Sequence, residues 1–182
     1  MHHILAWILF LSLTTTLSHA TSAPSFKQPD SPFDTIGLRL GGDVNADVSL
    51  TSYELFVTSE PQWSCELSEK VNAGIGYEAA IGALAGEGEV AADLHFGFSL
   101  KFAHQSIPVS VIITTGPSLY SEDSFGDFDI GGHIHFTSSF GLNWKMCESW
   151  TLEYRIQHTS NAGLEDNNPG LDMHAVALTR SF

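Results

Sequence analysis

A regular alternation of apolar and polar side chains runs through most of this chain. From Phe128 to Trp144 the even positions are almost all apolar, whereas the odd positions are polar residues or glycine. Successive side chains of a β-strand point to opposite faces, so this stretch predicts one long strand with an apolar face and a polar face.

The same two-residue period recurs along the chain and predicts eight strands. Besides 128–144, we expect strands near residues 36–41, 52–57, 71–81, 90–102, 107–119, 150–157 and 172–182. Ordinary strands have about 5–6 residues, and several of these reach the about 9–11 residues with which a strand crosses a bilayer. The lengths therefore favour a membrane β-sheet over a soluble sandwich.

Within a bilayer a sheet has to close, because lipid offers no hydrogen bonds to an unpaired strand edge. Eight antiparallel strands are the smallest common number for such barrels, and side chains fill the interior. The sequence thus predicts an all-β fold, an eight-stranded antiparallel transmembrane β-barrel.

The alternation also assigns side chains to the two sides of the barrel wall. The polar faces would fill the interior and the apolar faces would contact lipid. The expected interior residues are Arg39, Asp43, Glu54, Glu78, Asp93, His95, Lys101, His133, His135, Glu153 and Arg155, and the expected interfacial aromatic residues are Trp63, Tyr77, Tyr120, Trp144 and Trp150.

The N-terminal segment has the features of a cleaved signal peptide. An apolar run from Ile4 to Leu17 is too short to span a bilayer, and it ends in the small-residue pattern Ser18-His19-Ala20. We therefore expect a signal peptide over residues 1–20, a short periplasmic segment over 21–33 and the barrel over 34–182.

The composition of the chain excludes some classes of binding partner. A formal net charge of −14 argues against nucleic acid as a partner. The two cysteines, Cys65 and Cys147, match no zinc motif. Both fall on the expected periplasmic side, on strands that are not neighbours, and whether they form a disulfide stays open.

An N-terminus in the periplasm fixes which connections face outward. Outer loops are then expected near residues 44–49, 83–88, 120–127 and 159–171, and periplasmic turns near 60–66, 104–106 and 145–149.

Near the last outer loop, the stretch "QHTSNAGL" contains a candidate nucleophile and base. His158 and Ser160 share the parity of the lipid-facing residues, and so does Asp172 on the following strand. A hairpin with residues 159–171 as its loop would put Asp172 beside His158. An acid that orients a histidine, which in turn deprotonates a serine, is the arrangement of acyl-transfer enzymes. The alternative is that the strand has left the bilayer at His158, and both residues are merely hydrated.

The loop supplies further candidates. The turn Asn161-Ala162-Gly163 offers backbone N–H groups directly after Ser160, and such donors could stabilise an oxyanion. Glu165 is a second carboxylate candidate. His174 and Arg180 also have the lipid-facing parity, which means either that they lie at the membrane interfaces or that a bulge shifts the register.

The pattern "HTSNAGL…NNPGLD" resembles the motif of PagL-type outer-membrane lipid A 3-O-deacylases over about residues 154–182. The resemblance implies His158 as general base and Ser160 as nucleophile, with Asn161 as a motif residue. It places the Ala162 and Gly163 amides near the oxyanion and matches Asn168 to a further motif asparagine. Where well-described members have Glu as the third catalytic residue, this chain has Asp172. The terminal Phe182 likewise resembles the assembly signal of bacterial outer-membrane barrels.

The resemblance implies an outer-membrane serine esterase that removes the 3-position acyl chain of lipid A in lipopolysaccharide, with no metal or cofactor. Two alternatives remain: a non-enzymatic barrel of the OmpA or opacity kind, and another lipid-remodelling barrel such as a phospholipase or a palmitoyl transferase. The oligomeric state also stays open, including a homodimer.

Overall fold

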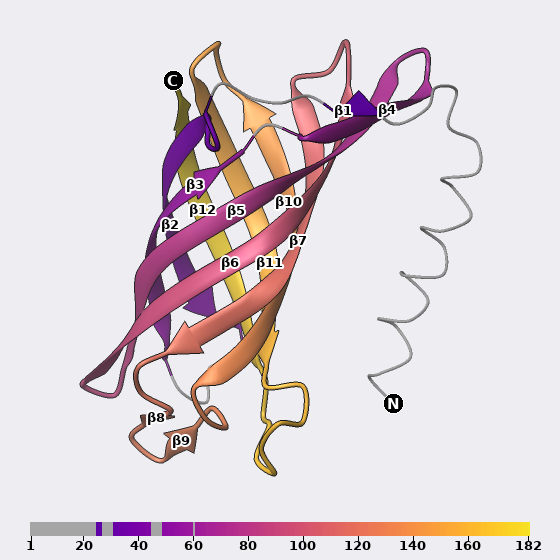
Figure 1. Cartoon of the computed structure of the whole chain (residues 1–182). Coiled ribbons are helices and arrows are strands. Elements are labelled where there is room, and N and C mark those ends of the chain that lie inside the picture. The colour runs from indigo at the N-terminus through magenta and orange to yellow at the C-terminus, as the bar shows by residue number, and fades with distance from the viewer. Residues whose placement is uncertain (1–24, 27–30, 45–48, 60) are drawn as a thin grey trace.

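The computed structural model describes residues 25–26, 31–44, 49–59 and 61–182, and within them eight antiparallel strands close a barrel (Figure 1). The predicted signal peptide lies outside the described residues. The barrel strands are β2 (Thr35–Asp43), β3 (Thr51–Thr58), β5 (Val71–Gly86), β6 (Glu89–His104), β7 (Val109–Tyr120), β10 (Ile134–Lys145), β11 (Trp150–Ser160) and β12 (Leu171–Ser181). The sheet closes through the pairing of β12 with β2 and of β5 with β6.

Two short strands extend this barrel at one end. β4 (Trp63–Ser68) pairs with the part of β5 that lies beyond the end of β3, and β1 (Ser25–Phe26) pairs with β4. The turn predicted near 60–66 is therefore wrong, since the chain reverses at residues 69–70 instead. The reason is the length of β5: its backbone edge continues past β3 and β4 satisfies those hydrogen bonds.

The single strand predicted for 128–144 is also wrong. Its first residues form β9 (Phe128–Asp129), which pairs with β8 (Ser124–Phe125), and β10 begins only at residue 134. Between them, Gly131 and Gly132 have φ angles of 86° and 87°. This left-handed region is open to glycine without strain, and two such residues in succession interrupt the pleat.

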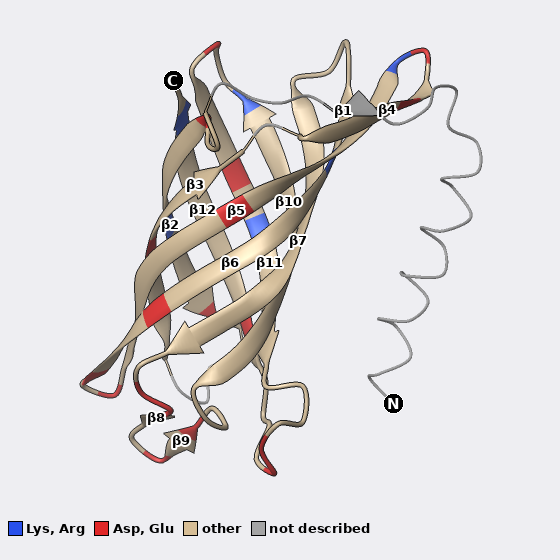
Figure 2. Ribbon diagram, viewed as in Figure 1, with Lys and Arg blue, Asp and Glu red and all other residues tan. Residues whose placement is uncertain are grey.

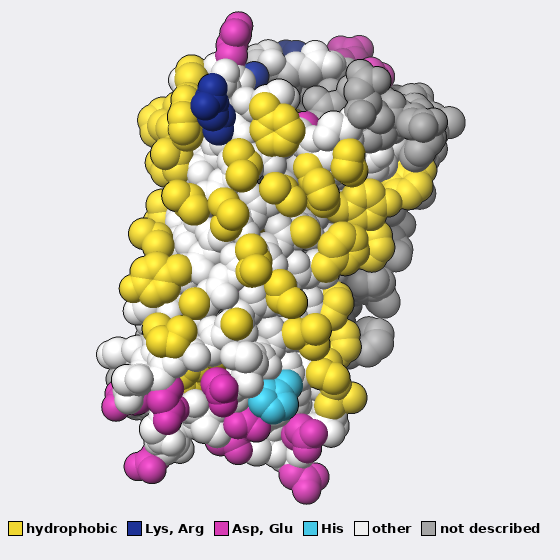
Figure 3. All heavy atoms as spheres, turned by 60° about the vertical axis from the view of Figure 1, so that its left-hand side comes forward, with side chains coloured by type: hydrophobic (Ala, Val, Ile, Leu, Met, Phe, Trp, Pro, Cys, Tyr) yellow, Lys and Arg dark blue, Asp and Glu magenta, His cyan; other side chains and the backbone are white. Residues whose placement is uncertain are grey.

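The alternation of faces is confirmed along the barrel strands. In β12, for example, Met173, Ala175 and Ala177 are buried, whereas Val176 and Leu178 are exposed on the outer wall. On the face of the barrel that Figure 3 presents, hydrophobic side chains are spread over most of the wall, and acidic side chains and a histidine lie near the lower end of the molecule. No helix among the described residues is long and apolar enough to cross a membrane.

The two ends of the barrel differ in their connections and in charge. We call the end with residues 44, 49–50, 87–88, 121–133 and 161–170 the loop end, and the end with residues 69–70, 105–108 and 146–149 the turn end. Apart from the two arginines inside the barrel, the described Lys and Arg residues lie towards the turn end, whereas the loop end is rich in acids (Figure 2). Cys65 and Cys147 are both free thiols.

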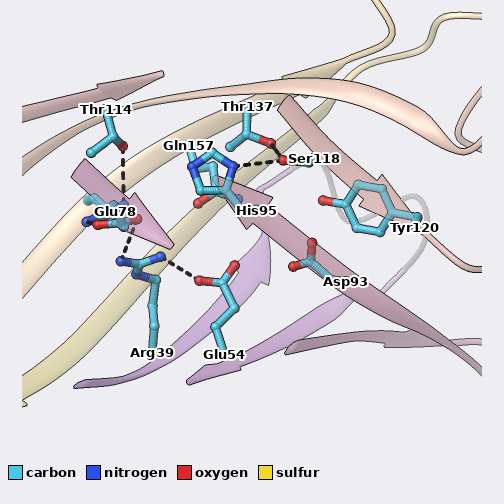
Figure 4. Close-up of a pocket in the computed structure, with 11 residues that line it drawn as sticks. Arg39, Glu54, Glu78, Asp93, His95, Thr114, Ser118, Tyr120, Thr137 and Gln157 are labelled. Carbon is cyan, nitrogen blue, oxygen red and sulfur yellow. Dashed lines mark hydrogen bonds and ion pairs between the residues drawn. The ribbon is translucent and has the colours of Figure 1, made fainter. Parts of the chain in front are cut away.

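Inside the barrel, two arginines and three glutamates from four strands form one ion-pair network. Arg39 on β2 contacts Glu54 on β3 at 2.5 Å and Glu78 on β5 at 3.0 Å. Arg155 on β11 binds both oxygens of Glu78, at 2.9 and 3.0 Å, and lies 2.7 Å from Glu153. All five side chains are buried. Figure 4 shows part of this network around Glu78.

The lumen is packed at this level. The cavity beside the network has a volume of about 10 Å³, and its lining includes Asp93, His95 and Gln157 (Figure 4). That is room for about one water molecule, so this part of the interior cannot hold a lipid.

Most of the expected interior residues are indeed buried, with three exceptions. Lys101 has the inward parity but is exposed near the end of β6, and His133 is exposed in the segment before β10, so both predictions are wrong. Asp43 is half-buried. The prediction that Tyr120 is an interfacial aromatic residue is wrong. Tyr120 has the inward parity and packs edge-on against His135 inside the barrel.

Removing the carboxylate shared by both arginines tests how far the network stabilises the barrel. Glu78→Ala leaves two buried guanidinium groups with less compensation, and we expect the free energy of unfolding to fall by about 3–5 kcal/mol. The free energy of unfolding is measured by urea titration in detergent. The folded fraction is monitored by the heat-modifiable gel mobility that is typical of barrels. Glu148→Ala, at an exposed position of the turn end, is the control. Equal midpoints for the two variants would contradict a stabilising network.

Candidate functional site

The hairpin of β11 and β12 brings together two of the predicted catalytic residues. His158 and Asp172 are direct cross-strand partners, and the Nδ1 atom of His158 lies 2.6 Å from Oδ1 of Asp172. Their side chains are 57% and 53% exposed on the outer wall. The pairing between the two strands runs without a register shift, so the bulge considered for β12 is wrong and the outward parity of Asp172 holds.

Ser160 ends β11 on the same outer face and is half-buried. The imidazole of His158 extends towards this level of the wall, because a Cβ atom added to Gly170 would lie 3.1 Å from its Cε1 and 3.9 Å from its Nε2. Gly170 precedes Leu171, the partner of Thr159, and is therefore level with Ser160. The Cε1 and Nε2 side of the His158 ring thus lies beside Gly170, where the absence of a side chain provides the space.

Thr159, which lies between these two residues, points into the barrel and anchors the strand from inside. Its hydroxyl lies 2.9 Å from that of Thr137, which lies 2.7 Å from Ser118. Ser118 in turn lies 3.0 Å from Nδ1 of His95. This chain of hydrogen bonds joins four strands behind the site and holds the end of β11 in place.

Asn161 is fully buried and organises the loop after Ser160. Its amide nitrogen donates hydrogen bonds to the carbonyl oxygens of Gly131 at 2.8 Å and Asn167 at 2.7 Å, and its Oδ1 accepts one from the N–H of Gly163 at 2.9 Å. The side chain therefore ties the 161–170 loop to the neighbouring loop before β10. This role accounts for an asparagine at this position.

A tight turn follows directly. The N–H of Leu164 donates to the carbonyl of Asn161 at 3.0 Å, and Ala162 and Gly163 have φ angles of 55° and 84°. Two successive positive φ angles define a type I′ turn. At Ala162 the left-handed conformation costs about 1–2 kcal/mol. The chain thus keeps a strained residue two positions after Ser160.

The hydrogen bonds of this turn reduce the number of backbone N–H groups that could stabilise an oxyanion. The N–H of Asn161 donates to Oδ1 of Asn168 at 3.2 Å, and that of Gly163 is engaged by Asn161. The N–H of Ala162 forms no hydrogen bond with any other described residue. Asn168 therefore fixes the loop, and of the three candidate amides that of Ala162 is available to a ligand.

The other candidate carboxylate lies elsewhere. Glu165 is exposed in the loop and packs beside Gly132 of the neighbouring loop. The carboxylate that contacts His158 is that of Asp172. Within the described part of the chain, no group of three or more His, Cys, Asp or Glu side chains could hold a metal ion.

The polar residues of the outer wall gather around His158. We call this set the wall patch: Thr115, Ser138, His158, Ser160, Asp172 and His174. Within it, the hydroxyls of Thr115 and Ser138 lie 2.9 Å apart. His174 stacks on Tyr154, whose hydroxyl lies 2.5 Å from its Nδ1. Arg180 is separate, at the turn end beside Trp150.

Comparison with known proteins identifies the family. The family model described as "Lipid A 3-O-deacylase (PagL)" matches residues 51–181. The chain belongs to the PagL family. The lipid A deacylase PagL of Bordetella bronchiseptica is 36% identical over 67 residues, 37% of this chain and 38% of that protein. The lipid A deacylase PagL of Pseudomonas aeruginosa is 28% identical over 79 residues, 43% of this chain and 46% of that protein. The matches thus span less than half the length of these curated relatives.

A solved structure shares the fold. The crystal structure of the outer membrane enzyme PagL superimposes with a TM-score of 0.70 at 18% identity, over 81% of this chain and 99% of that one. Together with the apolar outer wall and PagL family membership, this fold places the chain in the outer membrane as a multi-stranded barrel.

Sequence reasoning missed three features of this PagL-family site. The space left by Gly170, the anchoring by Asn161 and the pairing of Thr115 with Ser138 all depend on strands or loops that are distant in sequence. The one available signal was parity, since Thr115 and Ser138 are polar residues at lipid-facing positions of their strands.

The anchoring role of Asn161 can be tested without reference to activity. Asn161→Ala removes three hydrogen bonds, each with a net stabilisation of about 1 kcal/mol. We therefore expect the 161–170 loop to be cleaved by thermolysin at least about tenfold faster, as measured by mass spectrometry of the fragments. Asp166→Ala, at an exposed position of the same loop, serves as the matched control. Cleavage at the control rate would argue against the anchor.

Proposed function

We propose that this chain is an outer-membrane esterase that hydrolyses the ester-linked acyl chain at the 3-position of lipid A. The observation that carries the proposal is the hydrogen-bonded pair of His158 and Asp172 on the lipid-facing wall, with Ser160 on the same face. Membership of the PagL family supports the same reaction and substrate.

The reaction follows from the roles of these groups. Nε2 of His158 takes the hydroxyl proton of Ser160. At the same time the Oγ atom of Ser160 attacks the ester carbonyl carbon. The negative charge that develops on the carbonyl oxygen is stabilised by the N–H of Ala162. Asp172 holds Nδ1–H of His158 and stabilises the imidazolium.

The tetrahedral intermediate then collapses. The bond between the carbonyl carbon and the sugar oxygen breaks, and the imidazolium of His158 donates its proton to that oxygen, which leaves as an alcohol. Water then attacks the acyl-serine with His158 again acting as base, and the products are the free fatty acid and restored Ser160. The net reaction consumes one water molecule.

The site on the wall suits a substrate that never leaves the bilayer. The loop end would face outward, so that a lipid in the outer leaflet could bring its ester bond to Ser160 while its acyl chains stay against the apolar wall. The packed lumen offers no comparable space at the level of the ion-pair network. All proposed catalytic groups come from one chain, so a homodimer is not required.

Loss of the nucleophile or of the base should abolish the reaction without unfolding the barrel. For Ser160→Ala and His158→Ala we expect release of fatty acid from lipid A to fall by at least about 10³-fold, because nucleophilic and base catalysis are both lost. Mass spectrometry of lipid A detects the missing acyl chain, and heat-modifiable mobility reports the fold. Full activity of Ser160→Ala would exclude the mechanism. Release from phospholipid vesicles but not from lipid A would point to a phospholipase instead.

The acid is tested by two substitutions that differ in charge. Asp172→Asn keeps the size of the side chain but removes the charge that stabilises the imidazolium, and we expect kcat to fall by about 10²–10⁴-fold. Asp172→Glu keeps the carboxylate and should retain more activity than Asp172→Asn. Glu165→Gln is the control for the second candidate carboxylate. If Glu165→Gln shows the larger loss of kcat, the assignment of Asp172 is wrong.

A further inference from the structure

Arg180 is a cation on the lipid-facing side of the barrel wall. It follows Leu178 on the outward face of β12 and is exposed, whereas the other described Lys and Arg residues have inward strand positions or lie in the turn at residues 69–70. Figure 3 shows a basic side chain among hydrophobic ones near the upper end of the wall, which is the turn end. A guanidinium on such a surface is unfavourable unless water or an opposite charge compensates it.

The position of Arg180 along β12 gives its depth in the membrane. Asp172 and Arg180 are eight positions apart on this strand, which corresponds to about 26 Å at about 3.3 Å per residue. With a strand tilt of about 35–45°, this length crosses about 20 Å of the bilayer, close to the about 25 Å height of the apolar band of such barrels. The two residues therefore lie near opposite borders of that band, and Arg180 is at the level of the lipid headgroups of the leaflet at the turn end.

The protein itself leaves the charge of Arg180 uncompensated. Within the described part of the chain the guanidinium forms no ion pair and no hydrogen bond, and Glu148 in the adjoining turn lies beyond ion-pair distance. Arg180 instead contacts its cross-strand partner Trp150, whose ring centroid lies 5.9 Å from the Cζ atom. A cation–π contact engages the face of the ring and leaves the N–H donors of the guanidinium available.

The surroundings of Arg180 match the parts of a phospholipid. A guanidinium binds two oxygens of a phosphate with parallel N–H groups, which a lysine cannot do. Tryptophan is enriched at the headgroup level of membranes, where Trp150 is placed by its pairing with Arg180. Ile36, the partner of Arg180 on β2, and Leu178 are exposed on the same outer face and can contact acyl chains.

We propose that Arg180 and Trp150 form a binding site for the phosphate of a phospholipid in the leaflet at the turn end. The phosphate oxygens accept hydrogen bonds from the guanidinium, and the acyl chains run from there along Leu178 towards the middle of the membrane. The bound lipid contacts β11, β12 and β2, and so covers the β12–β2 pairing through which the sheet closes. This site lies at the opposite border of the wall from Ser160, and it does not depend on the esterase activity.

Native mass spectrometry of the folded barrel in detergent micelles tests the site, because it gives the Kd of the first bound lipid. The two probes share their acyl chains: dioleoyl phosphatidylglycerol carries a phosphate and dioleoylglycerol does not. For Arg180→Gln we expect the Kd of phosphatidylglycerol to rise by about five- to tenfold, since charge-assisted hydrogen bonds are lost, and the Kd of dioleoylglycerol to stay unchanged. Arg180→Lys, which keeps the charge without the fork of N–H groups, should show a smaller rise.

Lys101→Gln is the matched control, because it removes one positive charge towards the same end of the barrel from an inward strand position. Its Kd for phosphatidylglycerol should equal that of the wild type, and heat-modifiable mobility shows that each variant is folded. An unchanged Kd in Arg180→Gln overturns the proposal. An equal rise for both lipids, or an equal rise in Lys101→Gln, also overturns it, because apolar contacts or net charge would then account for the binding.

Discussion

Hydrogen bonding of the backbone in a medium without water is the constraint on which this structure depends. Every strand edge in lipid has to be paired, so the sheet closes through β12 with β2 and β5 with β6. Closure divides all side chains into those that face the lumen and those that face lipid. The lumen of so small a barrel is filled by side chains, and a lipid-directed site is then left to the wall.

The polar interior supports the site as well as the barrel. The ion pairs of Arg39 and Arg155 join four strands, and the hydroxyl chain from His95 to Thr159 reaches the strand end that carries His158. The imidazole therefore projects from a strand that is held from behind by fixed hydrogen bonds. A catalytic group in such a setting needs little reorganisation during the reaction.

The polar groups on the lipid-facing side of the site cost desolvation free energy, and these groups are confined to one area of the wall. Polar groups on this wall are unfavourable unless satisfied, and apart from Ser160 those of the wall patch occur in hydrogen-bonded pairs: His158 with Asp172, Thr115 with Ser138, and His174 with Tyr154. Pairing reduces the desolvation cost while one face of each pair stays open to a ligand. The strained turn at Ala162 belongs to the same area, and the N–H of Ala162 forms no hydrogen bond with the other described residues.

The two-residue period of the sequence was enough to predict the barrel, its strand number and the outward parity of His158, Ser160 and Asp172, because it fixes the face of every side chain within a strand. It failed where glycine backbone conformation or strand length decided the outcome, as at Gly131 and at the predicted turn near 60–66. Three features can be seen only in the folded barrel: which carboxylate meets the imidazole, which loop amide has no hydrogen bond to the other described residues, and which hydroxyls flank the site. Those features depend on the register between strands and on contacts between loops, which no local periodicity encodes.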